Sequence, residues 1–407
     1  MAFGIALSGL NAAQSDLNVT ANNIANSATT GFKQSRSEFA ELFAVSPYGV
    51  NRNAHGNGVK VAAVAQQFTQ GNINTTGNSM DLALSGQGFF ILSDGGSQAY
   101  SRSGAFQVNN DGYVVNAQQQ RLQVYPPSAT GNFNTSTLSD LRLVTSESSP
   151  QATTNVETVF NLPSASSVPT TTPFNPADES SYNTARSMTV YDSLGAAHTT
   201  SMYYVKTGTN AWTVHVSIDG NQLGTQALTY DQNGRLTSPA NGLAVMPTYD
   251  AAAGLSTGAA PINLTFDLGQ TTQFGDQFTM TSITQDGYTT GRLIGIDIDS
   301  TGVVQARFTN GRSTQLGQLA IANFSNPQGL QQLGDTNWAQ TFASGQPLNG
   351  QAGNSGFGLV QSGALEASNV DITAQLVNMI TAQRNFQANA QMIQTSDQIT
   401  QTIINIR

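Results

Sequence analysis

The 407-residue chain has no cysteine and very little charge, since Asp, Glu, Lys and Arg make up only 10% of its residues. The absence of cysteine excludes disulfide bonds, thiolate metal sites and a cysteine nucleophile. The net charge of −9 argues against a nucleic-acid partner, because no basic stripe is available to neutralise phosphates. No apolar run reaches the roughly 18 to 20 residues that span a bilayer. The N-terminus also lacks the basic and continuous apolar regions of a cleaved secretory signal.

Patterns that carry chemistry are missing as well. The sequence has no nucleophile elbow, phosphate loop or dinucleotide fingerprint. Its histidines, His55, His198 and His215, share no metal-ligand spacing, and we expect exposed structural roles for His198 and His215. We therefore predict no catalytic residue, cofactor or metal. A secreted carbohydrate-active enzyme or carbohydrate-binding module stays open as an alternative, because the separation of two carboxylates cannot be read from sequence.

Both ends of the chain carry a heptad pattern of apolar residues. At the N-terminus an apolar residue recurs every seven positions: Phe3, Leu10, Leu17 and Ile24. The alternating positions between them carry the small residues Ala6, Ala13 and Thr20. At the C-terminus the same spacing gives Ile372, Met379, Phe386, Ile393 and Thr400. The alternating C-terminal positions are assigned to Leu376, Gln383, Ala390, Asp397 and Ile404. Such spacing predicts paired helices of the coiled-coil type.

These predicted helices are unusual because almost no charge lies on any face. Asp16 is the only charged side chain before Lys33. The outer face of the C-terminal helix is expected to carry uncharged amides: Gln375, Asn378, Gln387, Asn389, Gln391, Gln394 and Gln398. An ordinary surface helix carries Lys and Glu there. We therefore expect neighbouring protein to cover these helices, which indicates self-assembly; an amphipathic helix packed on its own domain is the alternative.

The middle of the chain changes to a period of two, which predicts β-strands. Four apolar residues alternate with polar ones over one such run: Trp212, Val214, Val216 and Ile218. Turn sequences ending in glycine recur at 110–112, 192–195, 231–234 and 299–302, and a tight backbone bend is expected at 86–88.

The expected fold class is therefore α+β: a discontinuous coiled-coil terminal domain plus nested all-β domains. Composition breaks divide the chain into four parts. These are paired terminal helices at 1–30 and 366–407, a connector at 31–70 and 361–365, an all-β domain at 71–145 and 287–360, and an inserted outer all-β domain at 146–286.

Two terminal motifs resemble those of the bacterial flagellar rod and hook axial proteins. The first runs from Ala21 to Asn26 and continues through Thr30 to Lys33, and the second comprises the stretches 365–371 and 382–389. The residues that carry the resemblance are Asn22, Asn23, Asn26, Gly31, Phe32, Asn369, Asp371, Gln383 and Arg384. The stretches 88–90 and 100–106 are similar to further shared blocks. A large insertion containing 189–195 is similar to the hook branch, whereas the distal rod branch, kept as an alternative, is shorter.

The resemblance implies a tubular polymer of many copies on the cell exterior, acting as a flexible universal joint that passes motor torque from rod to filament. It also implies export without a cleaved signal, and several partners: the distal rod protein, the hook cap scaffolding protein, the hook–filament junction protein and the flagellar type III export apparatus. Asn22, Asn23 and Asn26 are expected to tie irregular backbone at the end of the first helix. Simple helix capping without contact between subunits is an equal alternative for them.

Overall fold

The computed structural model describes residues 2–42, 56–128, 131–143, 147–250 and 254–405, so His55 lies outside the described residues. The chain divides into two compact units. The first contains both chain ends and comprises residues 1–144, 295–307 and 313–407. The second comprises residues 145–294 and 308–312. The four-part division expected from composition stays a prediction.

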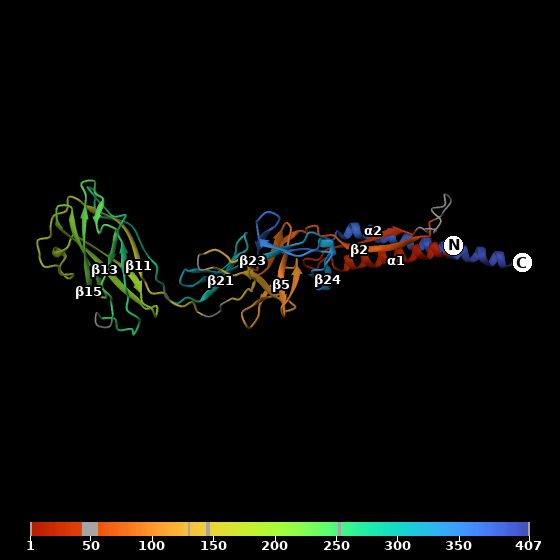
Figure 1. The fold of residues 1–407 in the computed structure, drawn as a ribbon, viewed down its shortest axis with the longest axis horizontal. Helices are drawn as coiled ribbons and strands as arrows, with labels where there is room; N and C mark the ends of the chain where they lie inside the picture. The colour runs from red at the N-terminus through yellow and green to blue at the C-terminus, as the bar shows by residue number, and fades with distance from the viewer. Residues whose placement is uncertain (1, 43–55, 129–130, 144–146, 251–253, 406–407) are drawn as a thin grey trace. The chain divides into compact units, whose positions relative to one another are not determined.

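Two long helices of the first unit carry the chain ends: α1 (Ala2–Ala25) and α2 (Ile372–Asn405). They run antiparallel, because Gly9 lies against Asn389 whereas Asn23 contacts Gln375. Figure 1 shows them side by side, with the C-terminal end of α2 projecting past the N-terminus. Among the described residues, no helix combines the length and the apolar character needed to cross a membrane.

A β-hairpin packs along α1 and joins the helices to the rest of the first unit. It consists of β1 (Ser35–Glu41) and β2 (Val59–Gln66). The Val59 N–H donates to Ser8 Oγ of α1 at 3.2 Å. Two further antiparallel pairs bring early and late segments together: β3 (Ile73–Thr75) with β28 (Ala364–Glu366), and β4 (Leu82–Ser85) with β27 (Leu359–Ser362).

The main sheet of the first unit has the strand order β21-β22-β23-β9-β5-β6-β25-β24, with β7, β8, β10 and β26 attached beside it. Successive residues of β5 enter different apolar clusters: Phe90 and Leu92 join one, and Phe89 and Ile91 the other. The period of two therefore buries both faces of this strand. The strands are β5 (Phe89–Asp94), β6 (Ser97–Ser101), β7 (Gln107–Val108), β8 (Val114–Val115), β9 (Arg121–Tyr125), β10 (Ser139–Asp140), β21 (Leu293–Ile298), β22 (Val303–Phe308), β23 (Ser313–Asn323), β24 (Gln331–Gly334), β25 (Asn337–Ala339) and β26 (Leu348–Gln351), with a 3-10 turn, η2 (Pro327–Gly329).

The second unit consists of two β-sheets. One is antiparallel, in the order β12-β13-β14-β15-β16, and the other has the order β17-β18-β11-β19 with β20 also paired to β11. The elements are β11 (Asn155–Pro163), η1 (Glu179–Ser181), β12 (Thr184–Tyr191), β13 (Ala197–Gly208), β14 (Ala211–Ile218), β15 (Asn221–Tyr230), β16 (Leu236–Ser238), β17 (Leu243–Val245), β18 (Thr265–Asp267), β19 (Thr272–Phe274) and β20 (Thr279–Gln285).

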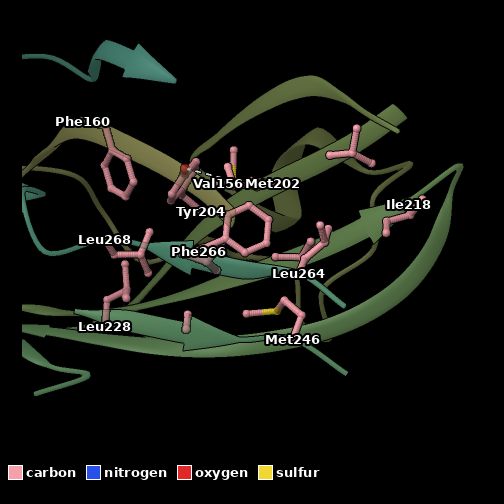
Figure 2. Packing of buried hydrophobic residues seen from close by; sticks show 14 of the residues in the cluster. Val156, Phe160, Met202, Tyr204, Ile218, Leu228, Met246, Leu264, Phe266 and Leu268 are labelled. Atoms are coloured by element: carbon pink, nitrogen blue, oxygen red, sulfur yellow. Dashed lines mark hydrogen bonds between the residues drawn. The ribbon is translucent and has the colours of Figure 1, made fainter. Parts of the chain in front are cut away.

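A dense apolar core fills the second unit, to which both sheets contribute (Figure 2). Phe160 of β11 and Tyr204 of β13 meet with ring centroids 4.8 Å apart, and Phe266 of β18 belongs to the same cluster. The alternation predicted for β14 is confirmed, since its four apolar residues are all buried: Trp212, Val214, Val216 and Ile218.

The predicted turns are also confirmed. In the turn at 192–195, the Gly195 N–H donates to the Asp192 carbonyl at 3.1 Å, and Gly195 adopts a φ of +84° that favours glycine. The Asp192 carboxylate accepts two further backbone N–H groups. The turns at 231–234 and 299–302 repeat this arrangement, whereas the first turn begins one residue earlier than expected, at Asn109. The expected α+β fold, with a discontinuous helical pair and nested β domains, is the observed one.

Candidate functional site

The two terminal motifs converge where α1 ends and α2 begins. Asn23 of α1 is 1% exposed and makes two hydrogen bonds with the backbone of Ser35: its Nδ2 donates to the carbonyl at 2.7 Å, and its Oδ1 accepts the N–H at 2.9 Å. The same Nδ2 reaches Gln375 Oε1 of α2 at 3.3 Å. Asn23 thus joins both helices and the β1–β2 hairpin.

Asn369 makes the corresponding connection from the C-terminal side. Its Oδ1 accepts the Gln34 N–H at 2.8 Å, and its Nδ2 donates to the carbonyls of Gln67 and Thr69 at 2.8 and 3.1 Å. Asp371 has a separate task as the cap of α2, because its Oδ1 accepts the N–H groups of the second and third helical residues at 2.8 and 3.1 Å.

The remaining N-terminal motif residues shape the chain as it leaves α1. Asn26 Nδ2 donates to the Asn22 carbonyl at 3.0 Å, and Thr29 Oγ1 donates to Asn26 Oδ1 at 3.1 Å. Gly31 has a φ of +69°, and a Cβ there would lie 2.5 Å from the Ser103 backbone nitrogen, so only glycine fits. Phe32 follows as a partly buried residue. The Asn26 side chain therefore caps the Asn22 carbonyl at the end of α1, whereas Asn23 connects separate elements. A role of these residues in contacts between subunits stays a prediction.

Beneath these amides lies a buried cluster of three charges that sequence reasoning missed. Lys33 Nζ contacts Glu366 Oε1 at 2.6 Å, and Arg102 Nη1 lies 3.3 Å from Glu366 Oε2. The side chains of Lys33 and Glu366 are fully buried, and that of Arg102 is 5% exposed. Lys33 also donates to the Thr69 carbonyl at 2.7 Å, and the Gly71 N–H donates to Glu366 at 2.9 Å.

This cluster places two cations beside one carboxylate. Burial lowers the pKa of the Lys33 ammonium and Arg102 lowers it further, whereas Glu366 opposes both effects without outweighing them. Burial likewise lowers the pKa of the Arg102 guanidinium. A buried charge without a partner is strongly unfavourable, so Glu366 is the residue that permits both cations to stay inside. The three residues lie in the shared stretches 30–33, 100–106 and 365–371. Charged residues are rare in this sequence, so their presence in these stretches was the signal that could have indicated the cluster.

Within the chain, the helical pair uses a different seam from the predicted one. In the first predicted row Met379, Phe386 and Ile393 are half-buried, whereas Ile372 and Thr400 at its two ends are exposed. The second row, however, consists of Gln375, Ala382, Asn389 and Ser396, one residue before the predicted alternating positions. Leu376, Gln383 and Asp397 are exposed, so their assignment was wrong for contacts within the chain, whereas Ala390 is half-buried as that row predicted. Gln375 and Asn389, expected on the outer face, lie inside the seam.

Close helix packing explains the shift. A Cβ at Gly9 would come within 2.5 Å of Asn389 Oδ1, so the Asn389 side chain of α2 occupies the space beside Gly9, where α1 has no side chain. The residues of α1 that are most buried are correspondingly small or polar: Ala6, Ala12, Ala13, Thr20 and Asn23. The predicted Leu10, Leu17 and Ile24 are only half-buried. The small residues predicted between them in the seam, Ala6, Ala13 and Thr20, are therefore confirmed as buried, whereas the large residues of the predicted seam are buried less completely.

Several predicted assembly residues stay exposed on the helical pair. Phe3 and Ile372 are each 49% exposed and Leu376 is 46% exposed. Other exposed apolar residues of α1 and α2 accompany them: Ile5, Leu7, Val377, Ile380, Met392 and Ile399. Gln383 and Arg384 are exposed too, and the side chain of Ile404 lies outside the described part of the chain. The assembly role of all these residues stays a prediction.

The expectation of an exposed His198 was wrong, because this residue is 7% exposed in the second unit. Its Nδ1 lies 2.6 Å from Asp219 Oδ2 and its Nε2 lies 3.4 Å from Asp192 Oδ2. His215 is half-buried and stacks on Phe174 with ring centroids 4.0 Å apart. Within the described residues, no cluster of three or more His, Cys, Asp or Glu side chains has a geometry that could hold a metal ion.

Models of four protein families match successive parts of the chain. Residues 3–33 match the flagella basal body rod protein family, and residues 83–157 match the flagellar hook protein FlgE/F/G D1 domain. Residues 161–288 match the flagellar basal body protein FlaE D2 domain, and residues 361–406 match the C-terminal family of the flagellar basal body rod proteins FlgEFG.

The chain is also similar to curated proteins over its whole length. It is 41% identical to the flagellar hook protein FlgE of Escherichia coli (strain K12) and 40% identical to that of Salmonella typhimurium, with 100% of both chains covered in each case. It is 34% identical to the FlgE of Borreliella burgdorferi, with 98% of each chain covered. In fold it is similar to the crystal structure of Helicobacter pylori FlgE2, with a TM-score of 0.54 and 14% identity, covering 72% of this chain and 100% of that one. Converging terminal motifs, nested β domains and full-length similarity together show that the chain belongs to the flagellar hook protein FlgE family.

Proposed function

We propose that this chain polymerises through its terminal helices into the tube of the flagellar hook. Membership of the hook protein family makes it a structural subunit of the flagellum rather than an enzyme. The proposal concerns how the subunit assembles and works: copies pack through α1 and α2, and the tube acts as a flexible joint that transmits torque from rod to filament.

The exposed apolar surface of the helical pair is the observation that supports assembly through α1 and α2. Val377 and Ile380 are 59% and 50% exposed on a helix whose only charged residues are Arg384 and Asp397. A helix facing water normally carries charge on its outer face, and contiguous exposed apolar residues indicate a protein interface. Neighbouring copies in a helical array would cover these residues.

We further propose that the hook lies outside the cell, and that its subunits leave through the flagellar type III export apparatus without a cleaved signal. The expected contacts at the ends of the tube are the distal rod protein, the hook cap scaffolding protein and the hook–filament junction protein. Weak helical material at the N-terminus, including Gly4 and Gly9 within α1, suits a segment that crosses a channel unfolded and folds on assembly.

Replacing Ile380 with Lys tests the proposal. Because Ile380 is half-exposed, the substitution should leave the free chain folded, yet it would bury an unpaired charge wherever a neighbour covers α2. We expect purified Ile380→Lys to stay in the supernatant after sedimentation under conditions in which the unchanged chain forms tubes visible by electron microscopy. Thr213→Lys, on the half-buried polar face of β14, is the matched control and should polymerise. Normal tubes from Ile380→Lys would contradict assembly through this face.

A further inference from the structure

The sparse charges of the two terminal helices suggest a specific contact between copies, an inference that rests on the proposed polymerisation. Asp16 is the only charged residue of α1, and Arg384 and Asp397 are the only ones of α2. None of the three takes part in an ion pair within the part of the chain that the structure describes. If a neighbouring copy covers these helices, each of these charges needs a partner of opposite sign, because a buried unpaired charge is strongly unfavourable.

Arg384 lies on the face of α2 that points away from α1. Ala382 and Phe386, two residues to either side, face the seam, and at 3.6 residues per turn the residue between them lies nearly opposite. Val377 and Ile380 precede Arg384 at the spacing that aligns residues along one face. These three residues, which we call the outer stripe, are all exposed. The stripe is apolar at one end and cationic at the other.

Asp16 lies in a surface of complementary character. It is half-buried and lines a groove of about 410 Å³ formed by α1, β1 and α2. Val19 and the 46% exposed Phe39 supply apolar surface in this groove. Arg36 also lines it, but its guanidinium pairs with Glu38 at 2.8 Å and so does not occupy Asp16. The groove therefore offers a carboxylate beside exposed apolar side chains.

We propose that the outer stripe of one copy docks in the Asp16 groove of a second copy, with the Arg384 guanidinium paired to the Asp16 carboxylate. The two surfaces differ, so the contact is heterologous, and a heterologous contact that does not close on itself generates a helical polymer. A pair held in a groove is less screened than one on an open surface, which favours the half-buried Asp16 over the exposed Asp397 as the partner. The pair also fixes which face of α2 meets the neighbour.

Charge exchange in the purified full-length chain tests the pairing. Arg384→Asp and Asp16→Arg should each raise the critical concentration for polymerisation at least about tenfold, measured by sedimentation, because each places like charges together. The double variant Asp16→Arg/Arg384→Asp restores the pair and should return to near the original critical concentration. Asp397→Arg reverses an acid elsewhere on the same helix and should leave the concentration unchanged.

Neutral substitutions give a second test that does not depend on tolerance of a reversed charge. If the pair exists, the critical concentration of the double variant Asp16→Asn/Arg384→Gln should be no higher than that of the more impaired single variant. The reason is that either single change already removes the ion pair. Additive losses would overturn the pairing. Single reversals that polymerise normally would overturn it too, as would rescue of Arg384→Asp by Asp397→Arg instead of Asp16→Arg. If the unchanged chain itself failed to polymerise, the proposed function would be at fault rather than this contact.

Discussion

The second unit and the terminal helices bury opposite kinds of side chain. The second unit encloses Phe160, Tyr204 and Trp212, each at most 1% exposed, between its own two sheets. The terminal helices bury alanine, threonine and amides against each other and leave Phe3, Val377 and other large apolar residues exposed. The core of the second unit is therefore formed entirely by residues of that unit. The terminal helices instead leave large apolar side chains uncovered within the chain, as expected if other copies cover them.

The two tryptophans allow each unit to be followed separately. Trp212 is buried in the second unit and Trp338 in the first, and the chain has no other tryptophan. Denaturant titration of Trp212→Phe and Trp338→Phe variants by fluorescence therefore reports the free energy of unfolding of one unit at a time. The predictions below use this readout where it applies.

The largest effect is expected for Glu366→Gln in the first unit. The substitution leaves Lys33 and Arg102 buried without a carboxylate, which should cost about 3 to 5 kcal/mol of unfolding free energy. The Trp338 signal should shift and the Trp212 signal should not. Asp140→Asn, which breaks a half-exposed pair with Arg121 in the same unit, should cost little. An unchanged Trp338 transition in Glu366→Gln would mean that the cluster contributes nothing to stability.

A comparable loss is expected for Phe160→Ala in the second unit. Removing a fully buried ring that contacts Tyr204 should cost about 3 to 5 kcal/mol, seen by Trp212. Phe386→Ala, the corresponding truncation in the helical seam, should cost less in the free chain because Phe386 is only half-buried there. Equal losses of unfolding free energy at the two sites would contradict the difference in burial between the second unit and the terminal helices.

A smaller and more local effect is expected at two glycines of α1. Gly9→Ala should destabilise the helical pair by about 1 kcal/mol, because the new methyl group must displace the side-chain amide of Asn389 from the seam. Gly4→Ala meets nothing within 4 Å and should instead stabilise the helix by roughly 0.5 to 1 kcal/mol. Hydrogen exchange of the α1 amides should therefore quicken in the first variant and slow in the second. Slowing in both would show that the helices are less closely packed than described.

The smallest effect is a pH dependence confined to the second unit. Burial alone would lower the pKa of His198, but hydrogen bonds and charge attraction from Asp219 and Asp192 outweigh it and raise the pKa above its ordinary value of 6.5. His198 therefore contributes stability that is fully present below pH 6.5 and is lost as the pH rises through its folded pKa. The Trp212 midpoint should fall over that window, and His198→Gln should abolish this slope. A slope that persisted in His198→Gln would assign it to another group.

Local patterns in the sequence were sufficient for much of the fold. The period of two over 212–218 predicted the buried face of β14, and the glycine-ended turns predicted where strands reverse. The heptad spacing at both ends predicted two helices that pair. These features depend on neighbours within a few residues, so the chain itself specifies them. The terminal motifs likewise indicated the family before any distance was known.

Only the tertiary structure decided which side chains meet. Lys33 and Glu366 lie 333 residues apart in sequence, and their pairing follows from the strands and loops that bring both ends to one point. The one-residue shift of the α2 seam buries Ala382 and Gln375 in place of Leu376, and the Asn389 side chain fills the space beside Gly9. His198 is buried because two turns supply Asp192 and Asp219 around it. Contact between distant segments depends on the backbone geometry and on the space that each side chain occupies. The periodicity of residues along a single segment gives no information on either.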